Sequence, residues 1–456
     1  MPDLEQKMHT HNAQIIALMS GWLAVGWVAT GQAAGFVEDS KATLSMRNTY
    51  YNDDYREGKG VNRLEEWGQG FQLQYQSGFT QGPVGFGVDA IGQYGARLDG
   101  GGRASSTGPG TDFSANADSR QPTNMFPRNS DGSSVNDFSS LSLAAKVRYS
   151  KTEFRYGVIQ PTMPVLTYIE GRLLPQLFEG AELTSKEIEN LKLTVGSIEQ
   201  VKDRGSSSYD SMKISGASED SNTFNYAGAD YQLNKNLLLQ YYYGNLEDFY
   251  KQHFLGAVNF WDLGGGRLKL DLRYFHSTAD GANKQGNPGY SSSGYYNNGL
   301  TPRGEVDNDL YSGMLTYTHS GHSLSLGYQK SEGESYFPSV NNGAGSYVYL
   351  ITDGMLGRFG AAGEKAWQGR YFYDFAAAGF PGLMAGMHYT RGDNIKSLGD
   401  ERKEFERIFF LGYTLQSGPL KDFSVMVTKS TYRTNQTGLR DQDEHKVFIR
   451  YEIPLL

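Results

Sequence analysis

The chain has 456 residues, with 42 Lys and Arg against 50 Asp and Glu, a formal net charge of −8 and no cysteine. These counts exclude a disulfide-stabilised scaffold, a Cys-ligated zinc or iron–sulfur site, a thiol nucleophile and the strongly basic surface of a nucleic-acid-binding protein. Glycine (57), Tyr (31) and Phe (24) are abundant, which is typical of β structure. Beyond the N-terminus no segment approaches the ~18 consecutive apolar residues of a spanning helix, so helical membrane proteins are excluded while β-barrels are not.

The N-terminus predicts a secretory signal. Residues 13–30 form an apolar stretch, and small residues at 31–34 (GQAA) precede the expected cleavage site. We therefore expect a signal peptide over 1–34, Sec-type export and a mature domain over 35–456. A membrane anchor is the alternative, disfavoured by Ser20, Gly21 and Gly26 within the stretch. Lys7 is the only Lys or Arg before the stretch, so Met8 is an alternative start.

From Lys41 onward the dominant period is two, as in strands with one apolar and one polar face. Residues 267–275 (RLKLDLRYF) alternate four charged side chains with Leu or Tyr, and residues 446–455 (KVFIRYEIPL) alternate similarly. A soluble sandwich would turn the apolar face inward, whereas a membrane barrel turns it toward lipid and lines a water-filled lumen with the charges.

The connections favour the membrane version of this all-β fold. Short joints, such as 81–83, 150–151, 234–236 and 319–321, alternate with long polar stretches over 98–138, 161–180, 201–222, 278–306, 332–364 and 392–404. Short turns at one rim and long loops at the other are typical of outer-membrane barrels, and aromatic clusters near strand ends would form interfacial girdles. We predict a transmembrane antiparallel barrel of about eighteen strands. Residues 209–216 are either a strand or part of a loop, and a soluble all-β protein is the alternative.

No catalytic or metal-binding motif accompanies this pattern. The sequence contains no G-x-S-x-G, Walker A, H-E-x-x-H or calcium-loop spacing. We therefore predict no enzyme activity, no cofactor and no metal site.

Cations recur on the face of the strands that would line the lumen. They are Arg47, Lys146, Arg148, Arg155, Lys269, Arg273, Arg370, Lys446 and Arg450. A row of fixed cations would guide anionic groups without trapping them at one point. For any single residue the alternative is structural pairing with a carboxylate such as Asp271, Glu153 or Glu452.

Several segments resemble the OprD-type outer-membrane carboxylate channels of Gram-negative bacteria. They are residues 35–40 (GFVEDS), 47–48 (RN), 67–71 (WGQGF), 77–90 (SGFTQGPVGFGVDA), 146–152 (KVRYSKT), 160–165 (QPTMPV), 172–176 (RLLPQ), 246–252 (LEDFYKQ), 363–368 (GEKAWQ) and 416–422 (QSGPLKD). They follow the order of the family from residue 35 to the C-terminus.

The resemblance implies an eighteen-stranded monomeric barrel narrowed by inward-folded loops, with basic wall residues that guide the carboxylate of a solute. By position, residues 161–178 would form the main constricting loop and part of 332–364 a second one. The expected constriction residues are Pro161, Thr162, Pro164, Arg172 and Pro175.

Two features depart from the family pattern. The segment 423–434 has Met426 and Thr428 where lumen-facing arginines are expected, and His388 stands where arginine is common. Fewer fixed charges favour a carboxylate whose body is apolar or aromatic. His388 completes the predicted basic wall.

The sequence thus predicts an outer-membrane porin that admits small carboxylate-bearing solutes, amino acids or aromatic and cyclic acids, by passive diffusion. A non-selective porin of the same fold is the alternative, and an outer-membrane hydrolase is a distant one. The expected partners are outer-membrane lipid and small anionic or zwitterionic solutes, with no nucleic acid. We expect a monomer, with a weak trimer as the alternative.

Overall fold

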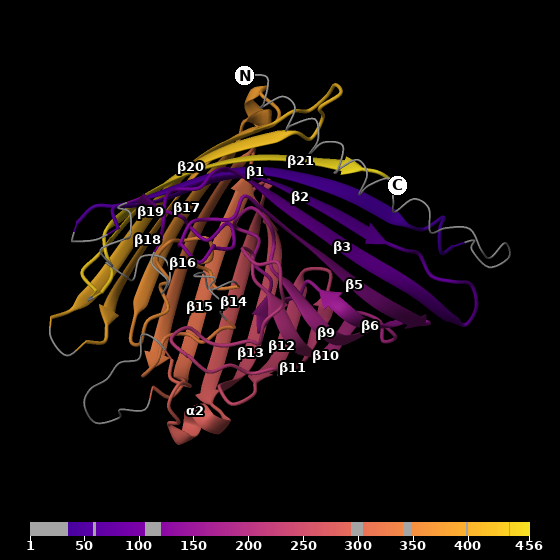
Figure 1. Cartoon of the computed structure of the whole chain (residues 1–456), viewed down its shortest axis with the longest axis horizontal. Helices are drawn as coiled ribbons and strands as arrows, with labels where there is room; N and C mark the ends of the chain where they lie inside the picture. The colour runs from indigo at the N-terminus through magenta and orange to yellow at the C-terminus, as the bar shows by residue number, and fades with distance from the viewer. Residues whose placement is uncertain are drawn as a thin grey trace.

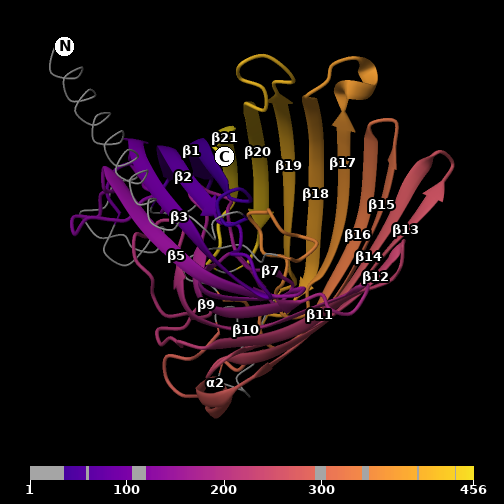
Figure 2. The same cartoon turned by 90° about the vertical axis from the view of Figure 1, so that its right-hand side faces the viewer.

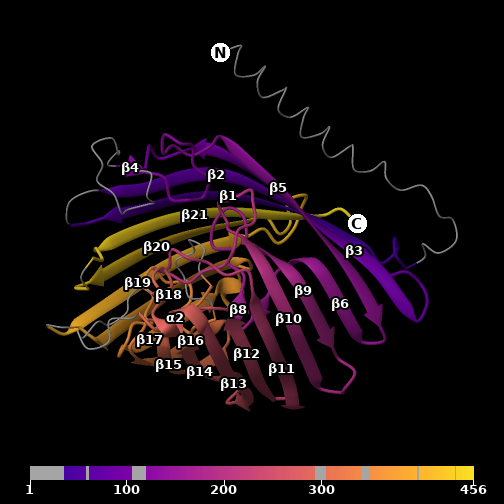
Figure 3. The ribbon, with the colours of Figure 1, turned by 60° about the horizontal axis from the view of Figure 1, so that its bottom comes forward.

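The computed structural model describes residues 35–57, 61–104, 120–292, 304–340, 349–397, 400–436 and 438–456. The expected signal peptide therefore lies outside the described residues. In these ranges eighteen antiparallel strands form a closed barrel, as predicted. Figures 1 and 3 show yellow β21 beside indigo β1, which closes the ring.

The strands of the barrel follow one another in chain order. They are β1 (Lys41–Tyr55), β2 (Arg63–Gln76), β3 (Val84–Asp99), β5 (Asp137–Tyr149), β6 (Thr152–Ile159), β9 (Leu177–Ser185), β10 (Leu191–Lys202), β11 (Phe224–Asn234), β12 (Leu237–Leu246), β13 (Tyr250–Leu263), β14 (Gly266–Ala279), β15 (Asp307–His319), β16 (His322–Gly333), β17 (Lys365–Asp374), β18 (Leu383–Ile395), β19 (Arg402–Thr414), β20 (Ser424–Thr434) and β21 (Gln442–Pro454). Each pairs with its sequence neighbours, and β21 pairs with β1 from Pro454–Thr43 to Gln442–Tyr55. The closed ring leaves no strand edge exposed to lipid.

The connections contain the remaining elements. The two-residue strand β4 (Arg120–Gln121) pairs in parallel with the outer end of β2, and β7 (Thr162–Met163) pairs with β8 (Leu166–Thr167). The helix α2 (Gly281–Gln285) follows β14, and the 3-10 helix η1 (Phe375–Ala378) follows β17. No helix among the described residues is long and apolar enough to cross a membrane.

Two segments differ from the sequence analysis, and the structure decides one alternative that the sequence left open. The helix α2 breaks the stretch 278–306 expected to be loop, and β9 begins at Leu177, inside the stretch 161–180. Residues 209–216 are loop, with isolated bridges from Asp210 to Val201 and from Met212 to Ser221. Each of these segments is short, so it carries too few periods for the pattern to distinguish strand, helix and loop.

The outer face of the barrel wall is apolar. Large apolar side chains such as Phe86, Leu143, Leu255 and Leu326 are more than half exposed on the outside, where lipid would cover them. The rim that bears the short turns, including Ser150-Lys151 between β5 and β6, is the periplasmic one by the usual rule for such barrels, and the long loops lie at the outer rim.

The lumen is partly filled, because inward-folded segments pack on apolar side chains of the wall. Phe254 and Phe275 are completely buried and their ring centroids lie 4.7 Å apart. They belong to one cluster with Met163 and Leu166 of the β7–β8 segment and with Phe337 of the connection after β16. Figure 2 shows β7 inside the ring of strands. Loops folded into the lumen were predicted, and the structure confirms them.

Glycine residues, which lack a Cβ atom, leave space for aromatic rings that lie flat on the inner wall. A Cβ atom at Gly228 would collide with the ring of Tyr242 on the neighbouring strand. The Tyr242 hydroxyl donates to Asp230 Oδ2 at 2.8 Å, so the ring spans the strand in one fixed position.

We expect Gly228→Ala to destabilise the barrel by about 1–3 kcal/mol, because the added methyl must displace the Tyr242 ring. Gly369→Ala is the matched control, since a Cβ atom there meets nothing within 4 Å. The urea midpoint of the folded band in unheated gel electrophoresis measures the difference. Equal midpoints for the two variants would contradict the assigned role of Gly228.

Candidate substrate pathway

The predicted wall residues lie on the lumen side of their strands. Arg47 is paired directly with Arg450, Lys146 with Arg155, and Arg370 with His388. The adjacent positions on these strands, such as Val147 and Tyr371, belong to the lipid-facing row. Their placement agrees with the alternation in the sequence, and their role in transport stays a prediction.

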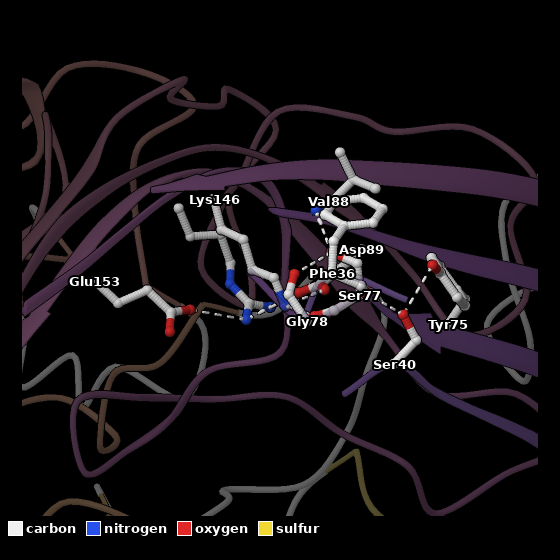
Figure 4. Close-up of polar contacts among 10 residues, drawn as sticks. Phe36, Ser40, Tyr75, Ser77, Gly78, Val88, Asp89, Lys146 and Glu153 are labelled. Atoms are coloured by element: carbon white, nitrogen blue, oxygen red, sulfur yellow. Dashed lines mark hydrogen bonds and ion pairs between the residues drawn. The ribbon is translucent and has the colours of Figure 1, made fainter. Parts of the chain in front are cut away.

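Two of these cations share one buried carboxylate. Lys146 Nζ lies 2.7 Å from Asp89 Oδ1, and Arg155 Nη2 lies 3.0 Å from Asp89 Oδ2. Lys146 also donates to the Ser77 carbonyl at 2.8 Å, and Arg155 reaches Glu153 at 3.3 Å. Figure 4 shows Lys146, Asp89 and Ser77 converging on the inner wall. Asp89 was not predicted; the register of β3 against β5 places it opposite Ala144, diagonally next to Lys146 on the same face.

Other wall cations are also neutralised. Asp271 pairs with Lys269 at 3.0 Å and with Arg273 at 2.8 Å, and Lys446 pairs with Glu444 at 2.6 Å. Structural pairing, the alternative considered for single residues, thus holds for these cations and for Lys146 and Arg155.

The pair formed by Arg47 and Arg450 is different. Arg47 Nη2 donates to Glu170 Oε2 at 3.0 Å, and Glu170 belongs to the constricting segment. The Arg450 guanidinium lies 5.6 Å from the centre of the Phe448 ring, and its side chain has no ion pair or hydrogen bond to another described residue. Like charges opposite one another on adjacent strands are unfavourable. Glu170 forms its ion pair with Arg47, and Glu452, on the same face of β21, accepts from the Ser45 hydroxyl at 3.3 Å. Neither carboxylate is within ion-pair distance of Arg450, so its guanidinium group could bind a further anion.

Two further predicted residues form neither an ion pair nor a side-chain hydrogen bond with the described residues. Arg148 is exposed near the periplasmic rim and stacks over the Phe79 ring at 4.2 Å. His388 packs edge-on against Phe410, with ring centroids 5.5 Å apart.

The constricting segment between β6 and β9 enters the lumen and is fastened to it. Leu173 and Leu174 are completely buried, and Leu173 fits against Gly68 and Gly70 of β2, where a Cβ atom would collide with it. Gln93 donates to the carbonyl of Pro175 at 3.1 Å. Arg172 donates to the Thr123 carbonyl and lies 5.7 Å from the centre of the Tyr51 ring.

The proline-rich start of this segment forms a short hairpin. Pro161 accepts a backbone hydrogen bond from Tyr168 at 2.8 Å, and Thr162 pairs with Thr167 across the β7–β8 hairpin. Pro164 sits at the turn between these strands. The pair β7–β8 thereby presents Met163 and Leu166 to the apolar wall.

One carboxylate and one cation that the sequence did not single out lie in the same region. Glu66 is buried and accepts from the Thr123 and Met125 amides at 2.9 and 2.8 Å and from the hydroxyl groups of Thr123 and Ser134. Arg204 is buried beside Arg172; burial first, and then the charge of Arg172, lower its pKa to about 9. An alternating strand pattern marks Glu66 as inward, but only the loop conformation shows what it binds.

The connection between β16 and β17 is the second inward segment. Arg273 donates to the Tyr349 carbonyl and Arg370 to the Ile351 carbonyl, so these cations hold the segment. On the opposite side Glu406 accepts from the Gly357 amide at 2.9 Å and Glu404 from the Phe359 amide at 3.2 Å.

Glu364, at the end of this segment, is completely buried beside Glu404 and accepts from the Ala361 amide at 3.0 Å. Burial first, and then the charge of Glu404, raise the pKa of Glu364 well above its usual range. A Glu364 carboxyl group that stays protonated avoids repulsion from Glu404 and so helps to hold the segment in place.

Within the described ranges, no group of three or more His, Asp and Glu side chains is arranged to hold a metal ion. The arrangement is instead that of a narrowed aqueous path with paired and unpaired cations on its wall.

Comparison with known proteins gives a consistent result. Residues 34–455 match the family model described as outer membrane porin, OprD family. The chain is 33% identical over 426 residues to the porin-like protein GalP of Pseudomonas putida, covering 93% of this chain and 94% of that protein. It is 32% identical over 453 residues to porin D of Pseudomonas aeruginosa, covering 93% of each.

Solved structures agree with the sequence relatives. Pseudomonas aeruginosa OccK8 (OprE) is 47% identical with a TM-score of 0.82, over 92% of this chain and 100% of that one. Pseudomonas aeruginosa OpdK, solved with vanillate, is 33% identical with a TM-score of 0.79, over the same shares.

We expect the second inward segment to loosen at alkaline pH. The raised pKa of Glu364 means that its contribution to stability is present at low pH and is lost as the pH rises from the unfolded value of the carboxyl through the raised one, when two adjacent carboxylates repel. The frequency of open-state current fluctuations should then rise by at most about tenfold per pH unit, because one proton is linked. Single-channel recordings between pH 5 and pH 9 measure it.

Glu364→Gln should abolish this pH dependence, because the amide cannot ionise. Glu187→Gln, at an exposed periplasmic turn, is the control that should keep it. A pH response of Glu364→Gln as large as that of the unmodified protein would assign the titration to another group.

Proposed function

Because the chain belongs to the OprD family of outer-membrane porins, we propose that it selects small carboxylates through the guanidinium pair Arg47 and Arg450. Family membership confirms the predicted outer-membrane location and the prediction of a porin rather than an enzyme, and it excludes the hydrolase considered as an alternative. The residues that bind the solute are the subject of the proposal.

The imbalance of charge at Arg47 and Arg450 carries the proposal. Glu170 forms an ion pair with Arg47 at 3.0 Å. Arg450 lies near Glu170 and Glu452 but has no carboxylate within 4.0 Å among the described residues. A solute carboxylate between the two guanidinium groups would relieve their repulsion, and exchange with Glu170 would let it leave again. Weak, exchangeable binding is what a diffusion channel requires.

The surroundings of this pair suit an apolar or aromatic solute body. Phe448 lies next to Arg450 on the inner face of β21, and Met426 is its direct partner on β20. Met426 and Thr428 bring no charge to this part of the wall. The solved OpdK structure contains vanillate, an aromatic carboxylate. We extend that chemistry to this chain as part of the proposal.

The barrel is proposed to act as a monomer, since one chain supplies the whole ring and both inward segments. A weak trimer is the alternative. Light scattering of the purified protein in detergent distinguishes the two masses.

Arg450→Gln should weaken current block by benzoate by about ten- to a hundredfold, because a charge-assisted hydrogen bond contributes about 1.5–3 kcal/mol. Planar-bilayer recordings under a salt gradient, with benzoate and then an uncharged sugar of similar size on one side, provide the measurement. The reversal potential should also move toward lower anion preference.

Arg63→Gln is the matched control, since Arg63 is exposed at the outer end of β2 and leaves the lumen unchanged. A large conductance that benzoate does not block would make the protein a non-selective porin. If benzoate blocks Arg450→Gln and the unmodified protein equally, the channel is still selective but Arg450 does not contribute to its selectivity.

A further inference from the structure

The outer surface of the barrel carries a group of cations that face away from the lumen. Arg391 on β18, Arg407 on β19 and Lys429 on β20 are exposed on the lipid-facing side, and His445 on β21 stands directly opposite Lys429. We infer that these four residues, termed the outer basic patch, bind the phosphate groups of a phosphorylated glycolipid in the outer leaflet of the membrane.

The register places the patch at one level of the barrel. The row of directly paired residues that begins at His322, at the inner end of β16, runs through Tyr373, Ala385, Leu411, Val427 and Val447 to Tyr50 in the outer half of β1. Paired rows therefore climb toward the outer rim from β16 to β1, as expected of tilted strands.

The positions of the cations compensate for this climb. Arg391 stands two residues closer to the outer rim than Tyr389, the partner of Arg407, and Arg407 stands two residues closer than Phe409, the partner of Lys429. The three charges thus form a belt at similar height across β18, β19 and β20, which lie side by side in Figure 2.

This level coincides with the outer edge of the apolar band. Toward the periplasmic rim, the next lipid-facing residues on the four strands are Tyr389, Phe409, Val427 and Val447, which are aromatic or aliphatic. Trp367, 63% exposed, stands directly opposite Arg391, as an interfacial aromatic residue would. Cations that follow directly on the apolar band meet the headgroups of the lipids that cover it.

The charges of the patch are not neutralised by the protein. None of its four side chains forms an ion pair or hydrogen bond with the described residues, and the Arg407 guanidinium instead lies 5.4 Å from the centre of the Phe409 ring. Elsewhere on the outer part of the wall, Lys251 pairs with Asp280 at 2.6 Å and Lys330 pairs with Glu332. The patch therefore has unsatisfied positive charge where these other sites have none.

The ligand class follows from location and charge. A solute in the lumen cannot reach side chains on the lipid side, and zwitterionic headgroups would bring no net charge. Guanidinium groups bind phosphate oxygens in bidentate fashion, and several cations on neighbouring strands match a headgroup with more than one phosphate. The inference uses the outer-membrane location and does not depend on the solute that the channel selects.

Native mass spectrometry of the purified full-length porin, titrated with lipid A in the absence of divalent cations, tests the inference. The double variant Arg407→Gln/Lys429→Gln should bind lipid A about thirtyfold more weakly, because each cation near a lipid surface contributes about fivefold. Lipid A that lacks both phosphates should bind the unmodified protein as weakly as intact lipid A binds the double variant.

The matched control is Lys251→Gln/Lys330→Gln, which removes the same charge from ion-paired sites and should change binding less than about threefold. An equal loss in this control, or equal affinity for dephosphorylated lipid A, would overturn the inference. Single-channel conductance, unchanged in both variants, verifies that the barrels have assembled. Should the double variant not assemble, Arg391→Gln alone is expected to show a fivefold loss, and an unaltered affinity would again overturn the inference.

Discussion

The pairing of β21 with β1 is the constraint on which the rest of this structure depends. In lipid, each backbone amide and carbonyl must find its partner in a neighbouring strand, so the sheet is stable only as a closed ring. Closure fixes which side chains face inward, because every strand has a direct partner on both sides. The lumen, the inward segments and the belt of apolar residues all follow from that single alternation.

Inside the ring, charge serves mainly to hold structure. Asp89 and Asp271 each neutralise two wall cations, while Glu66, Glu404 and Glu406 bind backbone amides of segments that enter the lumen. Arg273 and Arg370 bind carbonyl groups of the same kind of segment. A carboxylate that accepts several amides in a low-dielectric site is held firmly, so the narrow part of the channel is defined by these contacts. Only where they leave a cation unpaired, as at Arg450, does the wall remain available to a solute.

The sequence predicted the barrel and the inward direction of its cations, because alternation over ten or more residues is a strong local signal. The segment 267–275 placed Lys269 and Arg273 inside correctly. It could not show that Lys146 is neutralised by Asp89, since that contact joins different strands and depends on register. The sequence could not predict the role of Glu66 either, because its partners lie in a loop without periodic structure. Long-range contacts alone determine the conformation of that loop. Short elements such as α2 were also not predicted, because they contain too few residues to show a period.

The closed ring also permits other connections between its strands. The Leu455 amide donates to the Ala42 carbonyl at 2.7 Å, so the last strand ends beside the beginning of the first one at the same rim. A few added residues could join these positions, and the polypeptide could instead be opened at another periplasmic turn, such as Ser150-Lys151. The barrel is thus compatible with circular permutation, and the order in which its strands leave the ribosome is separable from the order in which they stand around the pore.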